Sequence, residues 1–135
     1  MSRLAILVAA CILPLAGARA QMPAQGECSK TPTPGELNWC ADPDLIEADR
    51  AFNKVYQEAL AMIADSSDTA LRKQDREEAL KQSQSAWIAF REEDCKRLIP
   101  LKWDGGTGTG DAVRDCLVEL TRARTKALSE RYVRP

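Results

Sequence analysis

The stretch "DPDLIEADRAFNKVYQEALAMIAD", residues 42–65, decides the fold class of this 135-residue chain. Its first two residues, Asp42 and Pro43, suit the N-cap and the first position of a helix. Apolar side chains then recur every three or four residues: Leu45, Ala48, Phe52, Val55, Tyr56, Ala59, Met62 and Ile63. This spacing predicts an amphipathic helix that ends near Asp65.

Two further helices are predicted downstream. Residues 66–68 offer an N-cap for a long helix over residues 69–98, which Pro100 closes. The second half of this helix carries an inward stripe of Leu80, Gln84, Trp87, Ile88, Arg91, Cys95 and Leu98. After a glycine-rich loop at residues 103–111, Asp111 is expected to cap a third helix. Its inner face is Val113, Cys116, Leu117, Leu120, Arg124, Ala127 and Leu128. No stretch alternates as a strand would, so the predicted fold is all-α, a small three-helix bundle.

The segment before the first helix is predicted to divide into a signal and a lead-in. Residues 1–20 have a positive start, an apolar core and a small-residue cleavage site, the pattern of a secretory signal peptide. Residues 21–32 form an extended lead-in, and residues 33–135 form the helical domain, which opens with a short helical turn over residues 33–40. Cys11 lies in a stretch that resembles a lipoprotein box. Lipidation there is not favoured, because the apolar run before it is too short and continues after it. The expected product is periplasmic or secreted, without stable membrane insertion after cleavage.

Composition and charge exclude several classes of function. Removal of residues 1–20 takes away two arginines and leaves 17 basic and 20 acidic residues, a net charge of −3. Nucleic-acid-binding proteins are usually basic, so this small negative net charge argues against that function. It is also uneven, because residues 27–70 carry −6 and residues 112–135 carry +3. The chain has no histidine, the usual general base and metal ligand. We therefore expect no catalytic site, no metal and no cofactor.

Four cysteines remain after processing: Cys28, Cys40, Cys95 and Cys116. An even number in a small exported domain is typical of two disulfides, whereas a four-cysteine zinc site needs closely spaced pairs that this chain lacks. In an up-down-up bundle all four cysteines gather at one pole, so three pairings are open. Closure of short loops favours Cys28–Cys40 and Cys95–Cys116 over the crossed pairings.

Charged residues at inward positions are the most informative feature of the predicted helices. Arg91 lies between Trp87 and Cys95 at a spacing of four, Arg124 falls among the apolar residues of the third helix, and Asp49 lies on the inner face of the first. An isolated buried charge is very costly, so Asp49 is expected to contact Arg91 or Arg124, with Trp87 packed over the pair. The alternative is that both arginines extend their charged ends to the surface.

Four pieces of the sequence together resemble one family. They are "CSKTPTPGELNWC" (28–40), "LIEADRAFNKVY" (45–56), "QSAWIAFREEDC" (84–95) and "CLVELTRARTKALSERY" (116–132). In this order, and with all four cysteines, they resemble the lysozyme inhibitor LprI-like N-terminal domain family of bacterial exported proteins. The resemblance implies an all-helical, disulfide-bonded domain in the periplasm or at the cell surface. It also implies inhibition of lysozyme by direct binding.

The acidic first half of the chain agrees with that implication. C-type lysozymes are strongly cationic, and an acidic surface would attract them. Asp44, Glu47 and Glu58 are therefore the candidate partner-binding acids. The alternative function is a structural or adaptor domain of the bacterial envelope that binds another protein without inhibiting lysozyme. Neither function requires catalysis, so we expect that the protein is not an enzyme.

Overall fold

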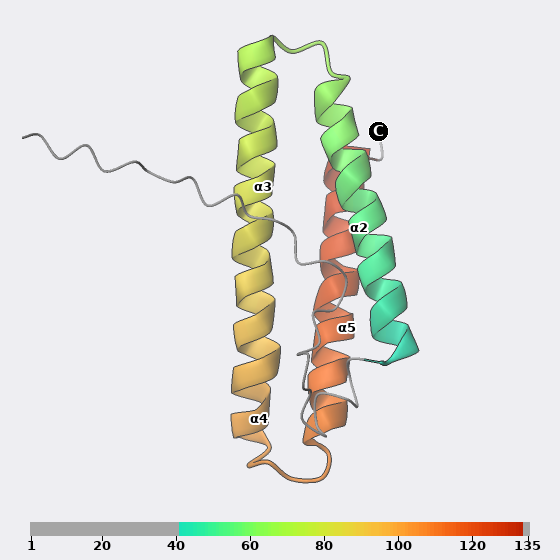
Figure 1. Cartoon of the computed structure of the whole chain (residues 1–135), viewed down its shortest axis with the longest axis vertical. Helices are drawn as coiled ribbons and strands as arrows, with labels where there is room; N and C mark the ends of the chain where they lie inside the picture. Colours follow the sequence, from blue (N-terminus) through green and yellow to red (C-terminus); the bar gives the residue numbers. More distant parts are fainter. Residues whose placement is uncertain (1–40, 134–135) are drawn as a thin grey trace, which may run out of the picture.

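The computed structural model describes residues 41–133, which form three long helices packed side by side in an up-down-up order (Figure 1). The elements in chain order are α2 (Pro43–Ala64), α3 (Ala70–Glu93), the π-helix η1 (Asp94–Leu98), α4 (Ile99–Lys102), α5 (Thr109–Leu128) and a second π-helix, η2 (Ser129–Val133). The described residues contain no strand, so the all-α prediction is confirmed. The predicted signal peptide, lead-in and short turn lie outside the described residues, as do Cys28 and Cys40.

Helix α2 has the predicted bounds because both of its ends are capped as the sequence suggests. The Asp42 carboxylate accepts hydrogen bonds from the backbone N–H groups of Asp44 (2.9 Å) and Leu45 (3.1 Å), and Asp65 is the C-cap. The prediction that Met62 lies in the core is wrong, because its side chain is exposed. Ile63, its neighbour, points inward instead, and successive residues on a helix point about 100° apart.

Helix α3 starts one residue later than predicted and does not stop at Pro100. Thr69 is its N-cap, while Asp68 turns back to pair with arginines of the first turns. The helix continues through η1 into α4 and ends at Lys102. In an uninterrupted α-helix the ring of Pro100 would clash with the carbonyl four residues earlier, and the wider π-turn accommodates it.

The π-turn also changes which residues face inward. It places more residues in one turn than an α-helix does, so the inward stripe advances by one position. Ile99 packs against the core, whereas Leu98, which the α-helical spacing predicts to be buried, is exposed. The prediction for Leu98 is wrong for this reason.

Helix α5 begins at Thr109, and its N-cap is Gly108 rather than Asp111. Asp111 lies in the first turn, where its carboxylate accepts a hydrogen bond from Arg114 (3.1 Å). The chain reaches α5 through a tight loop in which Gly105 has a positive φ of 68°. The indole of Trp103 lies so close to Gly108 that a Cβ there would be 2.5 Å from the ring.

The core consists of two hydrophobic clusters at different levels of the bundle. One contains Phe52, Tyr56, Ala59, Ile63, Leu80 and Leu128, with Trp87 packed against it. The other contains Leu45, Cys95, Val113, Leu117 and Val118, with Ile99 packed against it. On each helix a polar residue lies between the two clusters: Asp49 on α2, Arg91 on α3 and Thr121 on α5. The predicted inner face of α5 omits Val118 and Thr121, both of which are buried.

Candidate partner-binding surface and polar seam

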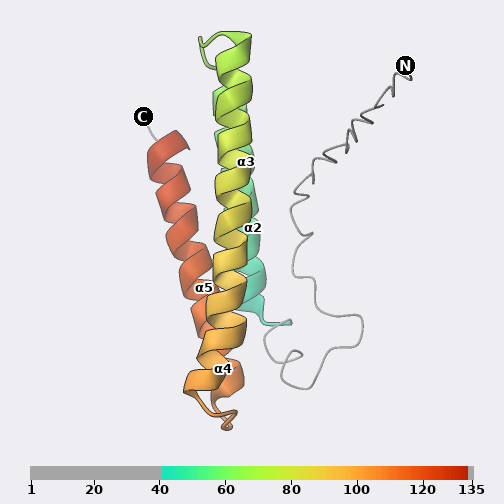
Figure 2. The same cartoon turned by 90° about the vertical axis from the view of Figure 1, so that its left-hand side faces the viewer.

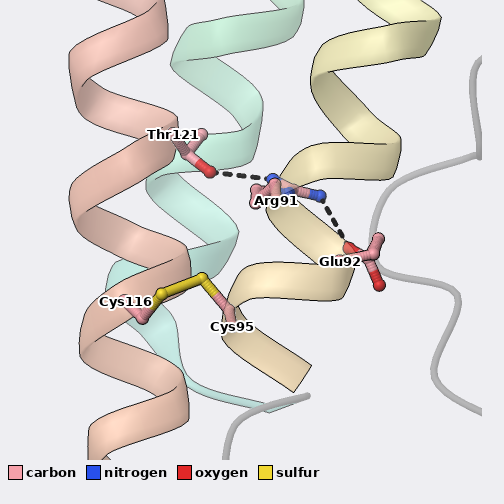
Figure 3. The surroundings of a disulfide bond; sticks show 5 residues. All are labelled: Arg91, Glu92, Cys95, Cys116 and Thr121. Atoms are coloured by element: carbon pink, nitrogen blue, oxygen red, sulfur yellow. Dashed lines mark hydrogen bonds and ion pairs between the residues drawn. A yellow bond between two sulfur atoms is a disulfide. The ribbon is translucent and has the colours of Figure 1, made fainter. Parts of the chain in front are cut away.

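A polar seam, formed by Asp49, Arg91 and Thr121, joins the three helices between the two clusters. One guanidinium nitrogen of Arg91, Nη1, donates to the Asp49 carboxylate at 2.9 Å and to the Thr121 hydroxyl at 2.8 Å. Nη2 donates to Glu92 at 3.4 Å (Figure 3). The Asp49 and Arg91 side chains are only 15% and 12% exposed. The structure therefore brings the predicted aspartate and the first arginine together, and it adds a threonine from α5.

Trp87 lies beside this seam, under both arginines. The guanidinium carbon of Arg91 is 5.1 Å from the centre of the indole ring, and that of Arg124 is 6.0 Å away. Both distances are within the range of cation–π attraction. Phe52 packs against the indole at 5.2 Å between ring centroids, so Trp87 connects the seam to the hydrophobic cluster above it.

Arg124 does not share the aspartate. Its guanidinium donates to the side-chain oxygen of Gln84 (3.3 Å) and to the hydroxyl of Ser83 (3.1 Å), both on α3. Among the described residues it has no acidic partner. Burial lowers the pKa of Arg124, and the nearby charge of Arg131 lowers it further. Of the two contacts predicted for Asp49, the structure therefore shows the one with Arg91, and neutral groups hold Arg124 separately.

Two donors near the seam have no partner within the described part of the chain. The amide nitrogen of Gln84 and Nε of Arg91 are buried and make no hydrogen bond. An unpaired buried donor costs about 1–3 kcal/mol. Sequence reasoning placed Gln84 on the inward stripe but did not identify it as the partner of Arg124. The available signal was an amide at an inward position of α3 facing an arginine at an inward position of α5.

A disulfide joins Cys95 of η1, one turn beyond Arg91, to Cys116 of α5 (Figure 3). The Cα atoms are 5.6 Å apart, and Cys95 is completely buried. The predicted pairing is confirmed for these two cysteines. Asp94 lies close to both sulfurs, but sulfurs bonded to each other cannot act as thiolate metal ligands.

The three candidate acids all lie on α2, and two of them have basic neighbours. A carboxylate oxygen of Asp44 is 3.7 Å from Arg122 of α5, and one of Glu58 is 3.8 Å from Lys54. Glu47 is exposed and has no ion pair within residues 41–133. Arg122 of α5 and Lys54 of α2 thus offset part of the negative charge of the candidate acids. Glu47 is the candidate acid whose charge is not offset by a direct partner.

Glu47 stands at the rim of an open groove of about 400 Å³ between α2 and α5. The groove lining contains small side chains, Ala48, Ala51, Val55, Thr125 and Ser129, and charged ones, Glu47, Arg122, Lys126 and Glu130. Sequence reasoning missed Arg122 and Lys126, although their spacing of four places them on one face of a helix. Within the described residues, this groove is the concave, partly apolar surface that a candidate partner-binding acid, Glu47, lines.

A family model described as "Lysozyme inhibitor LprI" matches residues 25–128. The chain belongs to the LprI lysozyme inhibitor family. It is 38% identical over 120 residues to an uncharacterized protein of Rhizobium meliloti (strain 1021), a match that covers 85% of this chain and 84% of that protein. No solved structure matches the chain. Within the described residues, no helix has the length and apolar character needed to span a bilayer.

The part of the chain that matches the LprI family contains the whole seam and most of the groove. Asp49, Arg91 and Thr121 fall inside it, as does the Cys95–Cys116 disulfide. The family description names a protein target and no reaction. Membership in the LprI family therefore indicates a lysozyme-inhibitor-like, protein-binding domain.

Proposed function

We propose that this LprI-family chain is an exported inhibitor that binds a cationic lysozyme through the groove between α2 and α5. The observation that carries the proposal is the position of Glu47, an exposed acid with no ion pair in the described residues, at the rim of a groove with a floor of small side chains. Residues 1–20, as a signal peptide, would deliver the domain to the compartment where lysozyme acts.

The arrangement of charge supports a cationic partner. Asp44 and Glu58 each hold their basic neighbour only at 3.7–3.8 Å, and exposed pairs of this kind are weak. A cationic side chain of a partner can therefore displace Arg122 or Lys54 from these carboxylates at little cost. Glu47 would make a new ion pair without losing an old one.

The rigidity of the domain supports inhibition by binding alone. The seam connects α2, α3 and α5 through Arg91, and the disulfide connects η1 to α5. A surface that is fixed before binding loses little conformational entropy when the complex forms. An inhibitor of this type needs no catalytic residue of its own.

One observation favours the alternative, an adaptor domain of the envelope that binds another protein. Arg122 and Lys126 line the same groove as Glu47 and Glu130, and this mixture of charges also suits a partner segment that carries both signs. A partner of that kind would bind the same groove, but lysozyme would not be inhibited.

A turbidity assay with a cationic lysozyme, combined with association rates at several salt concentrations, tests the proposal. Glu47→Gln should slow association several-fold and weaken inhibition, and added salt should slow association of the unaltered protein. Asp75→Asn is the matched control, because Asp75 is an exposed acid on α3 with no ion pair in the described residues. Binding without inhibition would favour the adaptor function. Inhibition that is indifferent to salt and to Glu47→Gln would exclude this groove.

A further inference from the structure

One end of the bundle exposes a group of large apolar side chains. Leu98 is 57% exposed, Leu101 73% and Trp103 47%. They lie on η1, α4 and the residue that follows, and this end of the α3–α5 hairpin extends beyond the start of α2 (Figures 1 and 2). Since α2 does not reach this level, no third helix among residues 41–133 covers these side chains.

Basic residues alternate with these apolar ones. The segment 95–103 contains Lys96, Arg97 and Lys102 and no acid. Arg97 is exposed and hydrogen-bonds Glu93 at 2.7 Å, and Lys102 has no ion pair in the described residues. The nearest acids in the loop and in α5 are Asp104, which is exposed, and Asp111, which Arg114 holds at 3.1 Å. Residues 96–104 carry a net charge of +2, but Lys96 and Arg97 are paired with Glu92 and Glu93 of the preceding turn. The positive charge that this end can offer to a partner therefore comes from Lys102 and from Arg97, whose exposed pair is weak.

We infer that this end, formed by Arg97, Leu98, Leu101, Lys102 and Trp103, binds the surface of a bilayer that contains anionic lipid. Leucine and tryptophan side chains partition into the interface between headgroups and acyl chains, and tryptophan is enriched there. Lysine and arginine beside them are attracted to anionic headgroups.

The sign of the charge separates this surface from the proposed inhibitory one. Arg97 and Lys102 at this end offer nothing that attracts a cationic lysozyme, whereas the groove between α2 and α5 offers Glu47. The two surfaces share no residue. A domain with both could hold its inhibitory groove close to the membrane while the groove stays accessible.

Sedimentation with lipid vesicles tests the inference. The mature protein should bind vesicles of phosphatidylcholine mixed with phosphatidylglycerol several-fold better than vesicles of phosphatidylcholine alone, and salt should reduce the difference. Leu101→Ser should lower binding to the anionic vesicles several-fold. Leu71→Ser is the matched control, because Leu71 is 69% exposed on the first turn of α3, at the other end of that helix. Circular dichroism checks that both variants fold, as the exposure of both leucines predicts.

Fluorescence provides a second readout. Lipids brominated near the headgroup should quench part of the tryptophan emission of the bound protein, and Trp103→Phe should remove that part. Lack of binding to anionic vesicles, equal binding to both kinds of vesicle, or equal binding by Leu101→Ser and the unaltered protein would each overturn the inference. Lysozyme inhibition in solution should be the same for Leu101→Ser and the unaltered protein, so failure of one proposal is distinguishable from failure of the other.

Discussion

Replacement of Asp49 by alanine should destabilise the protein far more than removal of an ordinary surface charge. The carboxylate accepts a 2.9 Å hydrogen bond from Arg91, and both side chains are almost covered. Without it, Arg91 is left largely stranded between two hydrophobic clusters, with Glu92 at 3.4 Å as its remaining acidic partner. The destabilisation comes mainly from that stranded charge rather than from the lost attraction.

The expected magnitude follows from the remaining partners of Arg91. Loss of one member of a fully buried pair costs about 3–5 kcal/mol. Arg91 keeps Thr121 at 2.8 Å and Glu92 at 3.4 Å, so about 2–3 kcal/mol is expected here. For a domain of about this size, 1 kcal/mol shifts the thermal midpoint by roughly 4–8 °C. Asp49→Ala should therefore lower the midpoint by about 10–20 °C, a shift that circular dichroism or calorimetry measures easily.

Two further variants make the reasoning refutable. Glu77→Ala removes an exposed ion pair with Lys81 and should have a small effect, as exposed pairs generally do. The double variant Asp49→Ala/Arg91→Met removes the stranded charge, so it should recover part of the stability lost in Asp49→Ala. If Asp49→Ala resembled Glu77→Ala, or if the double variant were less stable than Asp49→Ala, the stranded-charge explanation would be wrong.

Three other predictions concern the disulfide, the hairpin loop and acid pH. Replacement of both Cys95 and Cys116 by serine should lower the free energy of unfolding by about 3 kcal/mol, the value of the chain-entropy model for a loop of this size, in denaturant titrations. Gly108→Ala should displace the Trp103 indole; acrylamide quenching should rise, with little change in stability because the indole can move. The hydrogen bond from Arg76 lowers the pKa of Asp68 from its usual 3.8. The stability that this carboxylate contributes above pH 3.8 should therefore be lost as the pH falls through the lowered pKa, and Asp68→Asn should make the free energy of unfolding depend less on pH in this range.

The sequence predicts α2 well because local signals at both ends agree with the apolar spacing between them. Asp42 caps its start and Asp65 its end, and no turn of irregular hydrogen bonding interrupts it. The continuation of α3 could not be predicted in the same way. Pro100 normally ends a helix, and only the hydrogen-bond pattern of η1, in which the N–H of Ile99 donates to the carbonyl of Asp94, lets the chain pass it.

The candidate site was predictable in its residue types and not in its pairing. One inward acid and two inward arginines require that the acid be shared with at least one of them. Which arginine contacts Asp49 depends on the height of each residue along the bundle axis. The spacing of residues within one helix does not give the height of residues on another helix. Arg91 lies at the level of Asp49 and Thr121, whereas Arg124 lies at the level of Gln84. The pairing of Asp44 with Arg122 of α5 depends on levels in the same way, whereas Lys54 and Glu58 are four residues apart on α2 itself.

The seam and the groove occupy adjacent positions on the same two helices, so the contacts that stabilise the bundle also hold the proposed partner-binding groove. On α2, Asp49 of the seam directly follows Ala48 of the groove; on α5, Thr121 directly precedes Arg122. A slide of α2 along α5 by one turn would leave the buried guanidinium of Arg91 without one of its two inner acceptors, so the polar contacts oppose it. The separation of Glu47 from Arg122 and Lys126 across the groove is fixed by the same contacts. Asp49→Ala should consequently weaken partner binding as well as stability, even though Asp49 is directed away from the groove toward Arg91.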